Sequence, residues 1–237
     1  MLEAKEISFT YPGTTRAIYE DFSASVAPGE RVGLCAPSGF GKTTLCKIFA
    51  GYLRPQKGRV YIDGVALDTV RGACPVQLIG QHPERAFDSR LRMKDSLAEA
   101  GFDTGAPKAA QKNAPTAESK DVPALGAVVP KDVPALGAAV PKDEALLEAL
   151  GIKSQWLSRY PHELSGGELM RFCIARALMT NPRYLIADEI SSMLDALTSA
   201  ELWKFLLAEI DRRDMGLIFV SHSPALRERI ATRTVVL

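Results

Sequence analysis

A glycine-rich turn at residues 36–44, APSGFGKTT, constrains the fold of this chain more than any other feature. It follows an apolar run at residues 31–35, RVGLC, which is typical of a buried strand, and it precedes a segment with the apolar spacing of a helix. Gly39 and Gly41 allow backbone N–H groups to approach an anion closely, and Lys42 adds a positive charge. A strand, a phosphate-binding turn and a helix in this order predict an α/β fold with a mostly parallel core sheet.

The turn and a second strand together predict a nucleotide site of the P-loop NTPase type. Lys42 is placed to reach the β- and γ-phosphates, and the Thr43 hydroxyl can ligate Mg²⁺. The apolar strand YLIAD ends in Asp188, which can hold Mg²⁺ through water, and Glu189 can then orient and deprotonate the attacking water. We expect the whole turn to contact the nucleotide: Ala36, Pro37, Ser38, Gly39, Phe40, Gly41, Lys42, Thr43 and Thr44.

The turn departs from the P-loop pattern at one position, where Ala36 replaces a glycine. If the backbone there needs a positive φ, alanine costs on the order of 1 kcal/mol, because its Cβ atom clashes in that conformation. We expect a small loss of nucleotide affinity.

A second glycine pair, in HELSGGELMR at residues 162–171, has the chemistry of another anion site. A serine and two glycines open a predicted helix, whose free N–H groups attract negative charge. This stretch carries no lysine, so it is a phosphate cradle without a cation. One domain therefore contains two predicted phosphate-binding turns, and only the first of them has a lysine.

The rest of the chain divides into segments of different character. Residues 1–30 alternate apolar and polar side chains, which predicts short antiparallel strands. Residues 58–64, GRVYIDG, indicate a hairpin strand, and residues 75–81 and 216–220 indicate further buried strands. A helix of about fifteen residues is expected between YLIAD and residues 216–220. Near residue 100 the composition becomes polar and proline-rich, and residues 120–130 are repeated almost exactly at 131–141. We interpret about 101–143 as a low-complexity insertion that is weakly ordered, or less readily as a binding segment.

Composition excludes several classes of protein. The formal net charge of +1 gives no field that favours nucleic acid. The N-terminus carries charges where a signal peptide needs an apolar stretch, and we find no apolar run long enough to span a membrane. The four cysteines form no C-x-x-C pair and are expected to be buried, reduced thiols of a cytosolic protein.

Several motifs, in this order along the chain, resemble the nucleotide-binding subunit of ATP-binding cassette (ABC) transporters. Tyr11 matches the aromatic residue that stacks on adenine, and Gln81 matches the Q-loop. LSGGE at residues 164–168 is similar to the family signature LSGGQ, with Glu168 in place of glutamine. SMLD at residues 192–195 matches the D-loop, and His222 matches the switch histidine.

The resemblance implies a nucleotide-binding core at 1–81 and 182–237, with an antiparallel β subdomain, and an inserted α-helical subdomain at 82–181. It also accounts for the second cradle. In the family, the signature of one subunit closes over the ATP held by the P-loop of another. Ser165, Gly166, Gly167 and Glu168 would therefore contact the partner's ATP, although a carboxylate at 168 should repel phosphate unless it faces Arg171 or water. Gln81 and His222 would join Glu189 in catalysis, and Gln81 would also join Thr43 and Asp188 around Mg²⁺.

As a function, the resemblance implies the ATP-hydrolysing subunit of an ABC importer with ATP and Mg²⁺ as cofactors. Residues 81–93, QHPERAFDSRLRM, are similar to the peptide and nickel importer branch. The expected partners are a second ABC ATPase subunit, identical or paralogous, membrane permease subunits and a substrate-binding protein, and no nucleic acid. The expected location is the cytoplasmic face of the inner membrane, as a peripheral subunit. RLRMK at residues 90–94 is expected to be a solvated helix face, or else a contact with the membrane partner.

Three alternatives remain open at this point. An exporter or lipid transporter would use the same ATPase, and only the neighbouring genes would distinguish it. A soluble ABC ATPase that acts on ribosomes or DNA usually has two cassettes or a long coiled-coil insertion, and residues 101–143 lack heptads. A degenerate subunit would bind ATP without turnover, as Ala36 and Glu168 would allow.

Overall fold

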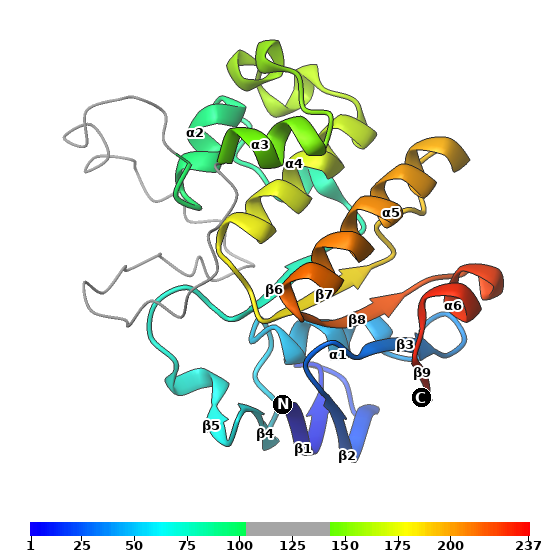
Figure 1. Cartoon of the computed structure of the whole chain (residues 1–237). Helices are drawn as coiled ribbons and strands as arrows, with labels where there is room; N and C mark the ends of the chain where they lie inside the picture. The colour runs from blue at the N-terminus through cyan, green and yellow to red at the C-terminus, as the bar shows by residue number, and fades with distance from the viewer. Residues whose placement is uncertain (103–142) are drawn as a thin grey trace.

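The computed structural model describes residues 1–102 and 143–237 as two sheets with helices packed around them (Figure 1). The predicted insertion with its repeat at 120–141 lies outside the described residues. The first sheet is antiparallel in the order β2-β1-β4-β5, built from β1 (Leu2–Thr10), β2 (Ala17–Val26), β4 (Lys57–Ile62) and β5 (Val65–Ala66). The predicted N-terminal strands and the hairpin turn at Asp63 and Gly64 are confirmed.

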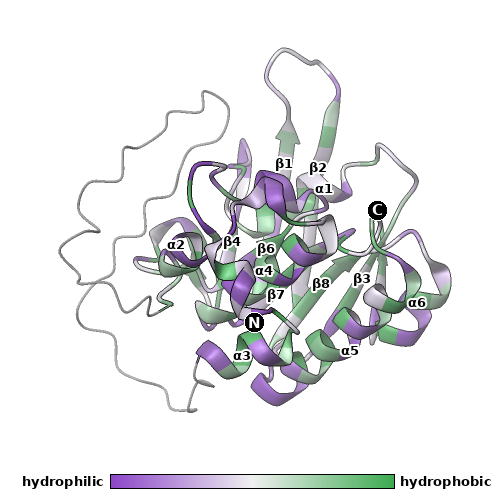
Figure 2. Cartoon of the chain, turned by 90° about the horizontal axis from the view of Figure 1, so that it is seen from above, coloured by the Kyte–Doolittle hydropathy of each residue, from purple (hydrophilic) through white to green (hydrophobic). Residues whose placement is uncertain are grey.

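The second sheet is parallel throughout and has the order β6-β7-β8-β3-β9. Its strands are β3 (Arg31–Cys35), β6 (Val76–Ile79), β7 (Tyr184–Asp188), β8 (Gly216–Val220) and β9 (Arg233–Val236). Every residue of β7 and β8 is buried, as expected for central strands covered on both faces. In Figure 2 these strands are green, on the hydrophobic side of the scale, between helices that carry purple, hydrophilic surfaces.

The two faces of the parallel sheet belong to two separate hydrophobic clusters, because side chains alternate along a strand. One face contributes Leu185 and Ala187 of β7 and Leu217 and Phe219 of β8. The other face contributes Tyr184, Ile186, Ile218 and Val220. The second cluster also contains the inner face of the antiparallel sheet, so a layer of apolar side chains joins the two sheets.

The helices are divided between these two faces. α1 (Lys42–Phe49) lies between the two sheets, and its Leu45, Ile48 and Phe49 are buried there, as predicted from their spacing. α4 (Gly166–Met179) and α5 (Ala196–Arg213) cover the opposite face (Figure 1). α4 buries Met170, Ile174 and Leu178 in the core.

The smaller elements complete the helical side and the C-terminal edge. α2 (Met93–Ala98) and α3 (Asp143–Ala149) pack beside α4, and α6 (Pro224–Ile230) joins β8 to β9. Short 3₁₀ segments lie at Leu67–Thr69, Pro83–Arg85, Ser154–Ser158 and Pro161–Glu163. Among the described residues, the helices lack the combination of length and apolar character that crossing a membrane requires.

Three expectations need correction. Residues 90–92 precede α2 rather than form a helix, and Met93 is fully buried, so RLRMK is not a solvated helix face. The helix between the last two predicted strands has 18 residues rather than about fifteen. Cys46 and Cys173 are buried, but Cys35 and Cys74 are only partly buried, so the prediction of four buried thiols is wrong for two of them.

Candidate active site

The predicted site residues follow strands that end at one edge of the parallel sheet. Leu34 of β3 and Asp188 of β7 both pair with Val220 of β8, so the ends of these strands lie in one row. Ile79 near the end of β6 pairs with Ala187 of β7. The P-loop, Glu189, His222 and Gln81 follow these ends, at the carboxyl edge where parallel α/β sheets bind ligands.

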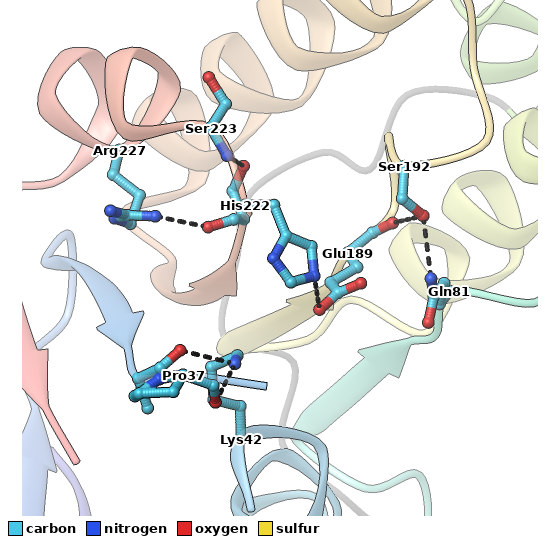
Figure 3. Close-up of polar contacts among 10 residues, drawn as sticks. Pro37, Lys42, Gln81, Glu189, Ser192, His222, Ser223 and Arg227 are labelled. Carbon is cyan, nitrogen blue, oxygen red and sulfur yellow. Dashed lines mark hydrogen bonds and ion pairs between the residues drawn. The ribbon is translucent and has the colours of Figure 1, made fainter. Parts of the chain in front are cut away.

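The P-loop forms a compact turn around the Lys42 side chain. The ammonium group of Lys42 donates to the carbonyl oxygens of Ala36 at 2.8 Å and Pro37 at 3.0 Å (Figure 3). Gly41 has a φ of 86°, and a Cβ atom there would lie 2.5 Å from Ile18 Cγ2, so position 41 requires glycine for two reasons. Ala36 is not among the residues with positive φ, so the strain considered for alanine at this position does not arise.

Asp188 is a buried carboxylate with an unsatisfied oxygen. Its side chain is 4% exposed, and Oδ1 has no hydrogen-bond partner. Burial is the main cause that raises the pKa of Asp188, and the neighbouring Glu189 adds to it, while a hydrogen bond with Thr43 acts in the opposite direction. A buried carboxylate oxygen without a partner, beside a threonine hydroxyl, is a donor set that suits a hard divalent cation.

Glu189 and His222 form an ion-pair contact that joins the ends of β7 and β8. Glu189 Oε1 lies 2.7 Å from His222 Nε2, and the glutamate side chain is only 14% exposed (Figure 3). Glu189 has a φ of 54°, which is unusual for a residue other than glycine. Its N–H donates to the carbonyl of Val220 at 3.2 Å, which holds the backbone in this conformation. Strained backbone of this kind is concentrated at functional sites.

Gln81 reaches this pair through Ser192, for which the sequence predicts no individual role. Gln81 Nε2 donates to Ser192 Oγ at 3.2 Å, and Ser192 Oγ donates to the carbonyl of Glu189 at 2.9 Å (Figure 3). The resemblance places Ser192 in the D-loop only as part of the SMLD motif. A serine three residues beyond a glutamate is a weak sequence signal, since it is common in ordinary turns.

The segment that carries His222 is anchored by an arginine that sequence reasoning also missed. Arg227 of α6 donates to the carbonyl of Ser221 at 2.7 Å, directly before His222 (Figure 3). Lys42, His222 and Arg227 are among the residues that line a cavity of about 370 Å³ beside the P-loop. The structure therefore brings three basic side chains to the predicted phosphate side of the site.

Tyr11 lies against the helix that follows the P-loop. Its hydroxyl forms a 2.9 Å hydrogen bond with Thr44 Oγ1, and its ring meets Phe9 edge-on with 4.9 Å between centroids. The side chain is 37% exposed, so part of the ring remains open to a ligand. This position is compatible with the predicted stacking on adenine.

The signature residues form a capping box at the start of α4. Ser165 is the N-cap residue, and its Oγ accepts from the N–H of Glu168 at 3.3 Å. In return, Glu168 Oε2 accepts from the N–H of Ser165 at 2.8 Å. Glu168 therefore faces the backbone of Ser165 rather than Arg171, whose guanidinium donates to Leu150 O and Glu201. A Cβ atom at Gly167 would lie 3.6 Å from Leu194 of the D-loop and Thr198 of α5.

The two cradles are carried by helices on opposite faces of the sheet. α1, which follows the P-loop, packs in the cluster between the two sheets. α4, which follows the signature, packs in the cluster of the helical side. The P-loop and the signature thus open helices that pack in two different hydrophobic clusters.

Comparison with known proteins decides the family. The sequence pattern of the family described as ABC transporter matches residues 19–192. The chain belongs to the ABC transporter family. It is an ATP-hydrolysing subunit of this family, and the predicted P-loop NTPase fold is confirmed.

The chain is similar to ATP-binding proteins that are named for import. The chain is 32% identical over 232 residues to the Glutathione import ATP-binding protein GsiA of Pectobacterium atrosepticum, a match that covers 94% of this chain and 33% of the relative. The chain thus spans about a third of the length of that protein. It is 28% identical over 237 residues to the Nickel import system ATP-binding protein NikE of Staphylococcus aureus, and it covers 86% of that protein.

Solved structures confirm the fold. A dimeric ATP-binding cassette in a post-hydrolysis state, bound to ADP and Pi, matches with a TM-score of 0.74 and 20% identity, over 100% of this chain and 94% of that one. The cbiO1 subunit from Clostridium perfringens, part of an ABC transporter complex, matches with a TM-score of 0.69 and 21% identity, over 99% of this chain and 83% of that one.

Proposed function

We propose that this ABC subunit drives import across a membrane by hydrolysing Mg²⁺-bound ATP with Glu189 as the general base. The observation that carries the proposal is the 2.7 Å contact between Glu189 and His222, at the edge of the sheet where Lys42 and the P-loop lie. A carboxylate held by an imidazole can orient a water molecule and accept its proton. His222 would then contact the γ-phosphate, and Tyr11 would stack on the adenine.

Mg²⁺ would be held by Thr43, Asp188 and Gln81, and when bound it neutralises charge on the phosphates. The unsatisfied Oδ1 of Asp188 supports this assignment. Among the described residues, no group of three or more His, Cys, Asp and Glu side chains could hold a metal by itself. A site with the single carboxylate of Asp188 fits Mg²⁺, which is usually bound by one or two carboxylates together with substrate phosphates and water.

The same proposal makes each ATP site a joint product of two subunits. Lys42 and the rest of the turn from Ala36 to Thr44 would hold the phosphates in one subunit. Ser165, Gly166, Gly167 and Glu168 of the other would close over them. The capping box supports this arrangement, because Ser165 Oγ accepts from Glu168 N–H and keeps its own proton to donate to phosphate oxygen. The partner ATPase would be a second copy or a paralogue.

Import is supported by the names of the relatives. One belongs to glutathione import and the other to nickel import. We propose a small peptide or nickel as cargo, with membrane permease subunits and a substrate-binding protein as further partners. The ATPase would be peripheral, at the cytoplasmic face of the membrane. Within it, residues 1–81 and 182–237 would bind nucleotide, and residues 82–181 would form the helical subdomain with the insertion at about 101–143.

Two measurements test the proposal. The purified chain should release phosphate from ATP with Mg²⁺ present and stop when a chelator removes the metal. A strain without the gene should lose uptake of radioactive nickel or of labelled glutathione, and the wild-type gene should restore uptake where Glu189→Gln does not. Active Mg²⁺-dependent hydrolysis with both uptake rates unchanged would overturn the cargo assignment and favour an exporter. Unchanged hydrolysis by Glu189→Gln would overturn the assignment of Glu189 as the general base.

A further inference from the structure

We propose that Ser192 is a positioning residue that selects the orientation of the Gln81 side-chain amide, so that its oxygen points away from the serine and is free to bind Mg²⁺. The proposal rests on the proposed function, because it concerns how Gln81 is prepared for Mg²⁺-bound ATP. The D-loop motif SMLD contains Ser192 but does not by itself indicate that the serine hydroxyl orients Gln81. Two hydrogen bonds of the Ser192 hydroxyl determine this orientation.

The first hydrogen bond fixes the proton of the serine. Ser192 Oγ lies 2.9 Å from the carbonyl oxygen of Glu189, and a carbonyl can only accept. The backbone N–H of Ser192 donates to the same carbonyl at 3.0 Å, so the turn from Glu189 to Ser192 is closed twice. The single hydroxyl proton of Ser192 is therefore committed to Glu189.

The second hydrogen bond follows from the first. With its proton committed, Ser192 Oγ has only lone pairs to offer, so it can accept but not donate. Gln81 approaches it at 3.2 Å through Nε2, which is a donor. The opposite amide orientation would place Oε1 against a second acceptor and lose the bond. Ser192 thus distinguishes the two ends of the Gln81 amide by chemistry rather than by shape.

The consequence concerns the other end of the amide. With Nε2 on Ser192, Gln81 Oε1 points away from the serine (Figure 3). Oxygen is the ligand type that Mg²⁺ prefers, whereas an NH₂ group would turn its protons toward the cation. The serine therefore orients the amide before the nucleotide arrives, which reduces the ordering needed on binding.

Ser192 also connects two strand ends. Gln81 follows β6, and Glu189 follows β7 in its positive-φ conformation. A movement of the segment at Gln81 would thus be transmitted to the backbone of Glu189 through the Ser192 hydroxyl. The chain offers a matched control next door, because the hydroxyl of Ser191 accepts from Trp203 Nε1 at 3.3 Å instead.

The test measures binding of a non-hydrolysable fluorescent ATP analogue with and without Mg²⁺, together with ATPase rates and melting temperatures. We compare Ser192→Ala, Ser192→Thr, Gln81→Ala, the double variant Gln81→Ala/Ser192→Ala, and Ser191→Ala as control. Ser192→Ala should weaken binding about three- to tenfold with Mg²⁺ present and leave binding without Mg²⁺ unchanged, the size expected for one lost hydrogen bond. Ser192→Thr should recover most of the loss, and Ser191→Ala should bind as the wild type.

The double variant separates orientation from simple support of the turn. If Ser192 acts through Gln81, adding Ser192→Ala to Gln81→Ala should change Mg²⁺-dependent binding by less than about twofold. Multiplying effects would overturn the proposal, as would wild-type binding by Ser192→Ala or equal losses with and without Mg²⁺. If Ser192→Ala has a lower melting temperature than the wild type, Ser192→Thr and the comparison of Gln81→Ala with the double variant still decide between these outcomes. Failure of the proposed function looks different, since the wild type itself would then show no Mg²⁺-dependent binding or turnover.

Discussion

Asp188 places a cost on the stability of the protein. Its carboxylate is buried, Oδ1 has no partner, and burial raises its pKa. Asp188→Asn should therefore increase the free energy of unfolding by roughly 1 kcal/mol, or about 2–4 °C in melting temperature, while abolishing Mg²⁺-dependent hydrolysis. Such a trade-off is common at active sites. A melting temperature at or below that of the wild type would contradict the interpretation.

The raised pKa also gives this comparison a direction with pH. Because the folded-state pKa of Asp188 lies above its unfolded value, the folded state binds the proton more tightly. The destabilising contribution is present above the folded pKa and disappears as the pH falls below the unfolded value. The advantage of Asp188→Asn in melting temperature should accordingly shrink as the solution is acidified, and thermal melts at several pH values check this.

Glu189→Gln should leave ATP binding intact and reduce hydrolysis by about 100-fold or more, because the amide keeps the shape of the side chain but cannot accept the proton. Gel filtration with ATP should show a longer-lived dimer. His222, at 2.7 Å from Glu189, can still contact the amide. If the variant turns over within about threefold of the wild type, an effect of less than about 0.7 kcal/mol, Glu189 is not the base.

At this scale the sequence predicts residues that stand next to a strand end, but not those that act through hydrogen bonds. Lys42, Asp188 and Glu189 follow from a glycine turn and an apolar strand. Ser192 and Arg227 do not, because a serine in a turn and an arginine on a short helix are ordinary. Their partners, the side chain of Gln81 and the carbonyl of Ser221, are fixed only by the folded backbone.

Among the elements, α4 shows how a helix start can serve stability and ligand binding together. Glu168→Gln should keep the capping box, because the amide oxygen also accepts from Ser165 N–H, and the melting temperature should stay near that of the wild type. It also removes a negative charge from the predicted phosphate side. ATP-dependent dimers of Glu168→Gln should therefore dissociate more slowly in gel filtration.

Glu168→Ala is the matched control for that comparison. It removes the same charge but also the capping box, which should cost roughly 1 kcal/mol and about 2–4 °C in melting temperature. If both variants form dimers no more stable than the wild type, the carboxylate does not repel the partner's nucleotide.

α6 carries the anchor of the switch segment. Arg227→Met removes the 2.7 Å hydrogen bond to Ser221 O, so His222 should lose its fixed position. We expect ATP hydrolysis to fall about three- to tenfold, in the range of one hydrogen bond from a charged group. Arg227→Lys should restore part of the rate. Arg229→Met, on the exposed side of the same helix, is the control and should behave as the wild type.

The sequence predicts strands and helices well where the apolar pattern is strong, and poorly where one distant contact determines where an element begins. The strands at 31–35, 184–188 and 216–220 follow from apolar runs, and the structure confirms them. The segment RLRMK is expected from the sequence to form a solvated helix face, yet the helix begins only at Met93. Its N–H bonds to the carbonyl of Arg159, and its side chain is buried. That distant contact leaves no trace in the local sequence.

For the whole molecule, the central question is how two phosphate cradles can act together when their helices pack on opposite faces of the sheet. α1 and α4 pack in different core clusters, separated by the parallel sheet. Two subunits facing each other would bring the P-loop of one to the signature of the other. The sequence suggests this only through resemblance, because no pattern within one chain encodes the contacts between two.

Mixing two defective variants tests the shared site. Lys42→Ala removes the cation of the P-loop, and Ser165→Arg blocks the signature. Each variant alone should show neither ATP-dependent dimerisation nor hydrolysis, because both sites of a symmetric dimer then carry a defect. In the mixed dimer, both defects fall in one site, and the other site pairs an intact P-loop with an intact signature. Some dimerisation or hydrolysis should therefore return.

The outcome discriminates because a complete site within each chain could not be rescued by mixing. The capping box of Ser165 and the fold of each variant are first checked by thermal melting, since arginine at the N-cap position costs roughly 1 kcal/mol. If the natural partner is a paralogue, the same substitutions are divided between the two chains. Well-folded heterodimers that recover neither property in either pairing would show that the signature does not complete the site of its partner. Recovery in the mixture alone would show that Lys42 of one subunit and Ser165 of the other act at the same ATP.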